Sequence, residues 1–278
     1  MDANTQDTMP AGGLDPIVAT IEANTNTYLL SFGLLPGAVV HDDGRGAWLS
    51  TDQGDGAFNA VVSARFDQTD LDDQIERVVA TFRTVRRPFT WHIGPSTTPR
   101  DLGAALLRHG LRHDEDEPGM AVELAVMHDE GETTPGLTIE TVCDARGLTE
   151  WTKLWLFALP TVFRDEMGGA LLAHGLGDDL PWRYYIGRLD GRPVACSHLF
   201  LGAGAAGVHH VVTLPDVRRQ GIGRAMTLAP LRDAYAQGYG VGVLTSSPES
   251  LGLYRSIGFK ERCWFHRYVW SPDAAPSA

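Results

Sequence analysis

The chain has no long apolar segment and few cysteines, and each scarcity excludes a class of protein or of site. No apolar run approaches the roughly 20 residues that a membrane helix needs. Cys143, Cys196 and Cys263 are far apart and form no C-x-x-C pair, which argues against a disulfide framework and a structural zinc site. Residues 1–13 contain no lysine, arginine or apolar core, so they do not resemble a signal peptide and we expect a disordered leader. We therefore expect a cytoplasmic protein.

Negative charge is concentrated in the first half of the 278 residues. Residues 1–135 carry 22 acidic residues against nine arginines, a net charge of −13, whereas residues 136–278 carry a net charge of +1. The basic residues form no patch of the kind that binds nucleic acid, so we expect neither nucleic acid nor a membrane as a partner. A polyanionic small molecule would be repelled by the first half and accepted by the arginine-bearing second half.

A glycine-containing turn in the second half separates a strand-like run, residues 207–214, from a helix-like run, residues 224–237. The turn reads Arg218-Arg219-Gln220-Gly221-Ile222-Gly223. Such a turn directs backbone N–H groups at one point beside the positive end of the helix dipole, and its glycines let an anion approach the backbone. It matches neither G-x-G-x-x-G nor G-x-x-x-x-G-K-[ST]. The turn therefore predicts a phosphate site of another kind.

Arg218, Gly221 and Gly223 fit the acyl-CoA loop, [QR]-x-x-G-x-[GA], of the GCN5-related N-acetyltransferase (GNAT) superfamily, which this part of the chain resembles. A second segment, residues 247–259, is similar to a later motif of that superfamily, a short helix that carries a tyrosine and ends in Y-x-x-x-G-F. Two motifs in the right order carry more weight than a six-residue turn alone. The resemblance implies acetyl-CoA as the acyl donor and no metal.

The order of the elements that we expect in the second half, β-α-α-β-β-β-α-β-α-β, is also that of a GNAT domain. A fainter copy of this order runs through the first half. There the turn that corresponds to the acyl-CoA loop, residues 67–73, has four carboxylates and no glycine. Those carboxylates suit a helix N-terminus and would repel a pyrophosphate. The resemblance therefore implies an α/β fold of two GNAT-like domains in tandem, each a central twisted mixed sheet flanked by helices, of which the first is degenerate.

Polar and turn-forming residues mark the boundary between the two expected domains. We predict a leader at 1–13, a degenerate GNAT-like domain at 14–126, a linker at 127–136, a catalytic GNAT domain at 137–271 and a tail at 272–278.

The resemblance also implies which residues bind the acyl donor. We expect these to be Val212, Thr213, Arg218, Arg219, Gln220, Gly221, Ile222, Gly223, Arg224 and Ser247. A backbone N–H of Val212 or Thr213 would stabilise the oxyanion of the tetrahedral intermediate. Ser247 replaces an asparagine that is common in the superfamily, and in front of Pro248 it is also a good helix N-cap, which is its simpler role.

Three residues are candidates for proton transfer. Tyr254 stands where the superfamily places the acid that protonates the leaving thiolate, although its spacing on a short helix also suits a core tyrosine. His209 and His210 lie on the strand that often carries the base, and strand alternation should point them to opposite faces, so that at most one faces the acyl group. Cys196 and His198 are weaker candidates, because no pattern of histidine and aspartate supports a covalent mechanism at the cysteine.

The acceptor pocket is expected from the first two helices of the second half. Trp155 and Phe163 offer apolar walls, and Asp165 and Glu166 would attract a cationic amine. A structural role is the alternative for these residues, with Trp155 in the core and the two carboxylates on a solvated helix face.

The resemblance thus implies direct transfer of an acetyl group from acetyl-CoA to the amine of a small molecule, with acetyl-CoA bound by the second half only. Two alternatives stay open. One is a tandem GNAT protein that binds acyl-CoA or a metabolite without turnover, and the other is a peptide or protein N-acetyltransferase. A monomer and a homodimer are both compatible with the tandem arrangement.

Overall fold

The computed structural model describes residues 13–53, 56–129, 134–157, 167–172, 175–177 and 179–272. The strands are β1 Val39–Asp42, β2 Ala47–Ser50, β3 Ala60–Val62, β4 Phe89–Ile93, β5 Arg112–Glu123, β6 Leu137–Thr141, β7 Trp182–Leu189, β8 Arg192–Gly202, β9 Ala205–Thr213, β10 Val241–Thr245 and β11 Lys260–Trp270. The α-helices are α1 Pro16–Ser31, α2 Leu71–Val85, α3 Leu102–Arg108, α4 Ala145–Trp155, α6 Ile222–Ala236 and α7 Leu251–Ile257. Residues 167–172 are helical as well.

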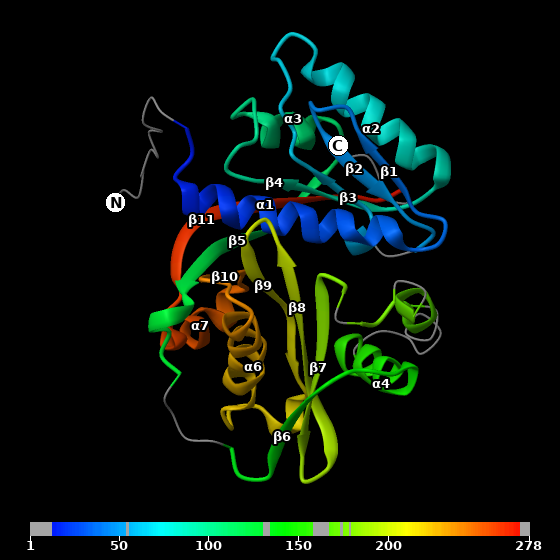
Figure 1. Ribbon diagram of the computed structural model, residues 1–278. Helices are drawn as coiled ribbons and strands as arrows, with labels where there is room; N and C mark the ends of the chain where they lie inside the picture. The colour runs from blue at the N-terminus through cyan, green and yellow to red at the C-terminus, as the bar shows by residue number, and fades with distance from the viewer. Residues whose placement is uncertain are drawn as a thin grey trace.

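All of these strands belong to one mixed sheet that runs through both halves of the chain (Figure 1). Their order is β1-β2-β3-β4-β11-β5-β10-β9-β8-β7-β6. The pairing is parallel between β3 and β4, which flank α2, and between β9 and β10, which flank α6; the other neighbours are antiparallel. Each half therefore contains one β-α-β unit, and the predicted mixed α/β fold with two related halves is confirmed. Among the described residues no helix is long and apolar enough to cross a membrane.

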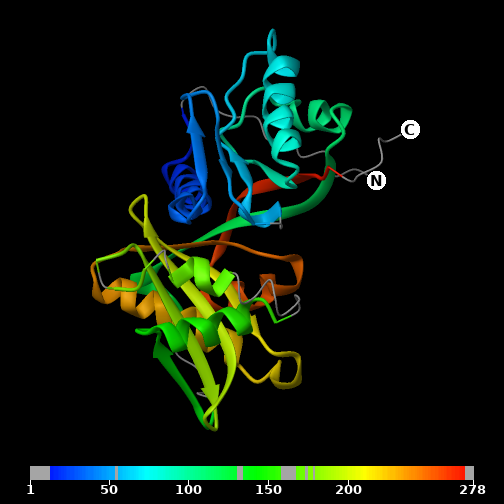
Figure 2. The ribbon, with the colours of Figure 1, turned by 90° about the vertical axis from the view of Figure 1, so that its right-hand side faces the viewer.

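The last strand of each half pairs with the other half. β11 comes at the end of the chain, yet it lies between β4 and β5, with His266 opposite both Ile93 and Asp116. β5 in turn pairs with β10, with Ala121 opposite Val243. In Figure 2 the two halves lie one above the other, and β5 and β11 pass between them. These two strands turn two half-sheets into one.

Helix α1 covers the place where the half-sheets join. Ile21 is fully buried in a cluster with Ala121 of β5, Phe265 of β11 and two residues of the second half, Ala205 and Val243. The side-chain amide of Asn24 donates to the carbonyls of Gly202, at 2.8 Å, and Ala205, at 3.2 Å. A helix from the start of the chain is thus docked on the hairpin between β8 and β9.

Two local features follow directly from neighbouring residues. Asp15 caps α1 by accepting a hydrogen bond from the N–H of Ile17 at 2.8 Å, with Pro16 at the first helical position. Asp190 and Gly191 form the turn between β7 and β8 with φ values of 49° and 81°, which is the left-handed pair that a two-residue hairpin needs.

The shared strand β11 should make the two halves unfold together. Phe265, 1% exposed, packs under α1, so Phe265→Ala should lower the free energy of unfolding by about 3–5 kcal/mol. Urea unfolding followed by tryptophan fluorescence and circular dichroism should show one transition, moved to lower denaturant. The neighbouring Trp264 is 49% exposed, and Trp264→Ala should cost about 1 kcal/mol or less. Two separate transitions, or equal losses in both variants, would contradict this account.

Candidate active site

A bulge in β9 shapes the centre of the second half. Cys196 of β8 lies opposite Val212, but the next pair is His198 with His209, so that His210 and Val211 together oppose the single residue between Cys196 and His198. His210 has a φ of 51°, which a residue other than glycine seldom adopts. A bulge of this kind bends the strand and redirects its side chains.

Both histidines of the bulge face the same cavity, so the expectation that they point to opposite faces is wrong. The extra residue and the positive φ of His210 break the alternation of the strand. Tyr28 of α1 contacts both rings: it stacks on His209 with 3.8 Å between ring centroids, and its hydroxyl is hydrogen-bonded to Nε2 of His210. Burial lowers the pKa of His210 to about 3 and that of His209 well below its usual value. Both imidazoles are therefore neutral at ordinary pH.

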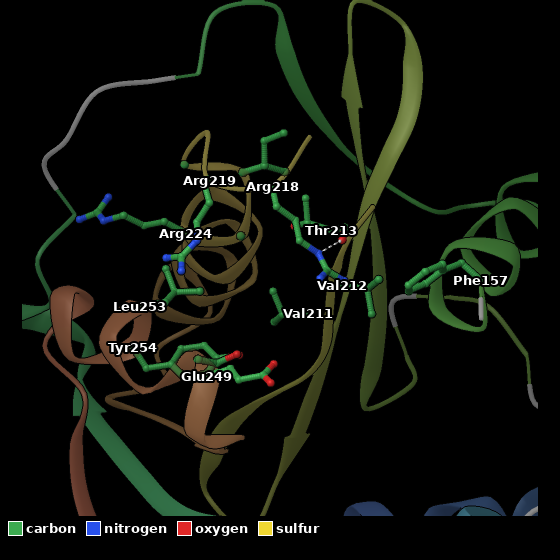
Figure 3. Close-up of a pocket in the computed structure, with 14 residues that line it drawn as sticks. Phe157, Val211, Val212, Thr213, Arg218, Arg219, Arg224, Glu249, Leu253 and Tyr254 are labelled. Atoms are coloured by element: carbon green, nitrogen blue, oxygen red, sulfur yellow. Dashed lines mark hydrogen bonds between the residues drawn. The ribbon is translucent and has the colours of Figure 1, made fainter. Parts of the chain in front are cut away.

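The glycine turn forms the N-terminus of α6. Gly221 is the N-cap residue with a φ of 80°, and Arg219 also has a positive φ of 64°. Nε of Arg218 donates to the carbonyl of Thr213 at 3.0 Å, which ties the turn to the end of β9 (Figure 3). Thr134 supports the turn from outside by donating to the carbonyl of Gln220 at 2.6 Å. The turn thus leaves free N–H groups at the start of a 15-residue helix.

A pocket of about 520 Å³ opens in front of this turn. Of the residues expected to bind the acyl donor, it is lined by Val212, Thr213, Arg218, Arg219, Gly221, Ile222, Gly223 and Arg224. Gln220 and Ser247 do not line it. It is also lined by residues that the sequence did not single out: Phe157, Val211, Glu249, Ser250 and Leu253. In Figure 3 Arg218, Arg219 and Arg224 surround the start of α6, with the guanidinium of Arg218 beside Thr213, and Glu249 and Tyr254 lie at the other end of the pocket.

Ser247 does not cap a helix through its side chain. It occupies the N-cap position of the short 3₁₀ turn Pro248–Ser250, but its hydroxyl makes no capping hydrogen bond and lies instead 3.2 Å from the hydroxyl of Ser250. The expectation of a side-chain cap is wrong, because the N–H of Ser250 bonds to the backbone carbonyl of Ser247, at 3.1 Å, and not to its hydroxyl.

Tyr254 of α7 stands between two cavities. It lines the pocket in front of the glycine turn and also a second cavity of about 280 Å³ that contains His209 and His210. The side chain is 7% exposed. Burial raises the pKa of Tyr254 to about 12, so the hydroxyl keeps its proton and can donate it.

The second cavity lies between the two halves of the chain. Its walls from the first half are Thr25, Tyr28, Leu29, Phe32, Phe58, Thr90, His92 and Glu117, and those from the second half are Trp155, Val208, His209, His210, Thr245, Tyr254, Phe265 and Arg267. Glu117 and Arg267 form an ion pair with 2.9 Å between Oε1 and Nη1. Nε2 of His209 and Nε of Arg267 are buried without a hydrogen-bond partner, and both belong to this cavity. Buried polar atoms of this kind are available to a ligand.

The residues expected in the acceptor pocket have different outcomes. Trp155 lines the second cavity. Its ring centroid lies 4.2 Å from that of His210 and 5.7 Å from that of Phe58. Phe163, Asp165 and Glu166 lie outside the described residues. Cys196 is fully buried, and burial raises the pKa of its thiol, which disfavours the thiolate that a nucleophile requires.

The corresponding turn of the first half is differently built. Before α2, the carboxylate of Asp70 is 2.8 Å from the guanidinium of Arg45, and that of Asp67 is 3.5 Å from it. Asp72 and Asp73 follow in the first turn of the helix. The N-terminus of α2 therefore already carries negative charge of its own.

Known proteins resemble this chain both in the sequence of its second half and in its overall fold. A family model described as an acetyltransferase (GNAT) domain matches residues 181–261. No curated protein sequence matches the chain. Among solved structures, a GCN5-related N-acetyltransferase from Kribbella flavida has a TM-score of 0.71 at 20% identity, over 91% of this chain and 96% of its own. One from Sphaerobacter thermophilus has a TM-score of 0.59 at 17% identity, over 93% and 92% of the two chains.

A tandem GNAT protein from the clavulanic acid biosynthesis pathway has a TM-score of 0.57 at 12% identity, over 93% of this chain and 94% of its own. The family model matches residues 181–261 only, whereas the structural similarity covers nearly the whole chain, including the half that lacks the glycine turn. The chain therefore has the fold of tandem GNAT proteins, and its second half contains a segment, residues 181–261, that matches a GNAT acetyltransferase domain.

Proposed function

We propose that the protein is an N-acetyltransferase that moves an acetyl group from acetyl-CoA to the amine of a small molecule. The observation that carries this proposal is the position of Tyr254, which lines both the pocket at the glycine turn and the cavity that holds the two histidines. An acid at the junction of a donor site and an acceptor site can protonate the leaving thiolate while the two bound molecules are held together.

The first pocket suits the donor. The N–H groups at the start of α6 and the side chain of Arg219 provide positive potential for a pyrophosphate, while the guanidinium of Arg224 donates to the carbonyl of His128. A Cβ atom at Gly223 would lie 3.4 Å from Leu253 and 3.8 Å from Thr213, so the missing side chain keeps the pocket open beside β9. The acidic turn before α2 has no such features, which supports binding of acetyl-CoA by the second half only.

Acetyl-CoA, when bound, supplies the thioester that is broken. A backbone N–H at the end of β9 would stabilise the oxyanion, and we assign this role to Thr213 because the N–H of Val212 donates to the thiol of Cys196. The protonated hydroxyl of Tyr254 can donate to the leaving sulfur. His209 and His210 are neutral and too weakly basic to hold a proton, so we propose that they orient the uncharged amine through hydrogen bonds. The proton that the amine loses after attack then replaces the one that Tyr254 gives to the sulfur.

The second cavity suits a small amine with an apolar body. Its walls include the aromatic rings of Phe32, Phe58 and Trp155, and its ion pair of Glu117 and Arg267 offers an acceptor and a donor to an uncharged amine. Since both halves line the cavity, a small molecule is favoured over an extended peptide, whose binding needs a long open groove. A binding protein without turnover has no use for an acid at Tyr254, which separates that alternative by experiment.

Gly221→Asp should abolish binding of acetyl-CoA. The φ of 80° strains any side chain at this position, and the carboxylate would add negative charge where the pyrophosphate is expected. Isothermal titration calorimetry with acetyl-CoA should give one site per chain for the wild type and none for the variant. Gly240→Asp adds the same charge at an exposed glycine with open space around it and should bind normally. Wild-type affinity in Gly221→Asp would refute the assignment of the donor site.

Tyr254→Phe should lower kcat roughly tenfold to a hundredfold while leaving the affinity for acetyl-CoA unchanged. Release of free thiol in the presence of a panel of amines measures kcat. Because the pKa of Tyr254 is raised to about 12, the hydroxyl stays protonated as the pH rises, so wild-type kcat should not fall between pH 7 and pH 10. Binding of acetyl-CoA without turnover of any amine by the wild type would favour the binding protein instead.

Tyr28→Phe tests whether the first half takes part in the reaction. The variant keeps the ring that stacks on His209 and removes the hydrogen bond to His210, so kcat/KM for the amine should fall about two- to tenfold. The affinity for acetyl-CoA should not change, since Tyr28 does not line the donor pocket. Tyr235→Phe, at a side chain that is 51% exposed, is the matched control. An unchanged kcat/KM in Tyr28→Phe would reduce the first half to a scaffold.

A further inference from the structure

Two histidines and an aspartate meet on the surface of β5 and β11, outside both cavities. Nε2 of His113 and Nδ1 of His266 each lie 2.7 Å from the same oxygen of Asp116, Oδ1. The three ligand atoms lie within 4.8 Å of one another. The side chains of His113, His266 and Asp116 are 44%, 45% and 46% exposed, so an ion from solvent can reach them.

A register shift brings these side chains to one face of the sheet. His266 is opposite Asp116 and Arg267 is opposite Glu115, but Tyr268 is opposite His113, so that one residue of β5 is skipped. Without the shift, His113 and Asp116 would point to opposite faces, because three positions separate them. The ring of His113 also packs edge-on against Tyr268, with 5.3 Å between centroids. The histidine is therefore held beside the aspartate by the backbone and by a neighbouring ring.

The positive charge of β11 is directed away from the cluster. The guanidinium of Arg267 bonds to Asp114, the skipped residue, at 2.7 Å, and to Glu117 at 2.9 Å. Among the described residues, Asp116 is paired with His113 and His266 and with no arginine or lysine.

We propose that His113, Asp116 and His266 bind a divalent transition-metal ion of the Zn²⁺ type. Two imidazole nitrogens and one carboxylate oxygen are a donor set that Zn²⁺ takes with bonds of roughly 2.0–2.2 Å, the fourth position being filled by water. The ligand atoms already converge, so the ion replaces the two hydrogen bonds to Asp116 after small side-chain rotations. Nothing in this site depends on acetyl transfer, and it stands or falls separately from the proposed function.

The ion would fix the end of the chain to the first half. His266 and Asp116 are 150 residues apart in the sequence, and the opposite face of the same two strands presents Glu117 and Arg267 to the second cavity. Since the three ligands come together only in the folded chain, binding must stabilise the folded state.

The test is a titration of the full chain, with any affinity tag removed, with ZnCl₂ in a buffer that does not bind metals. Calorimetry should show one site per chain, and the melting temperature should rise with added Zn²⁺. His266→Ala and Asp116→Ala should each weaken binding at least tenfold and remove most of the thermal shift. His128→Ala, at an exposed histidine outside the cluster, should behave as the wild type.

Substitution with Co²⁺ adds a measurement that does not depend on a variant. Visible absorption typical of tetrahedral Co²⁺ should appear at one equivalent in the wild type and disappear in His113→Ala. Absence of binding to the wild type would overturn the proposal. So would binding that persists in both histidine variants, which would place the ion elsewhere, such as at His109, whose Nε2 lies 2.9 Å from Asp72.

Discussion

The pairing of β11 with β4 on one side and β5 on the other is the constraint on which the rest of the structure depends. A strand inserted between two others satisfies backbone hydrogen bonds along both of its edges, and here those edges belong to segments far apart in the chain. In this strand exchange, β11 pairs with the first half and β5 pairs with the second half, and the two pairings hold the halves together. The exchange thereby fixes the second cavity, whose floor is formed by Phe265 and Arg267 of β11 and whose walls come from both halves. It also creates the surface on which His113, Asp116 and His266 meet.

The second cavity is kept nearly free of net charge by burial. Desolvation lowers the pKa of His92, His209 and His210 and raises that of Tyr254, so all four groups are neutral at ordinary pH. The opposite charges of Glu117 and Arg267, which form an ion pair within the cavity, cancel each other. For the proposed reaction such an interior favours an amine in the uncharged form, which is the form that attacks a thioester.

Features set by neighbouring residues could be predicted from the sequence, and features set by distant ones could not. The cap at Asp15, the turn at Asp190 and the glycine at the start of α6 each follow from a rule that acts over a few residues. The bulge at His210 does not, because a positive φ at histidine has no local signature and arises from the register between β8 and β9. The wrong assignment of His209 and His210 to opposite faces has this origin. Tyr28 escaped notice for a related reason: it reaches the histidines from a helix about 180 residues earlier, which no pattern near the glycine turn reveals.

The pairing of β11 with β4 and β5 also determines when during synthesis the chain can complete its fold. A ribosome releases the first half well before residues 260–270, so at that time β4 and β5 have no strand between them and each exposes an unpaired edge. The half that resembles an independent domain is therefore incomplete until the final strand arrives. Folding must close a loop that spans more than half of the chain, which is a slow kind of step. A protein with two domain-like halves thus acquires its native state as one unit, once β11 has been synthesised.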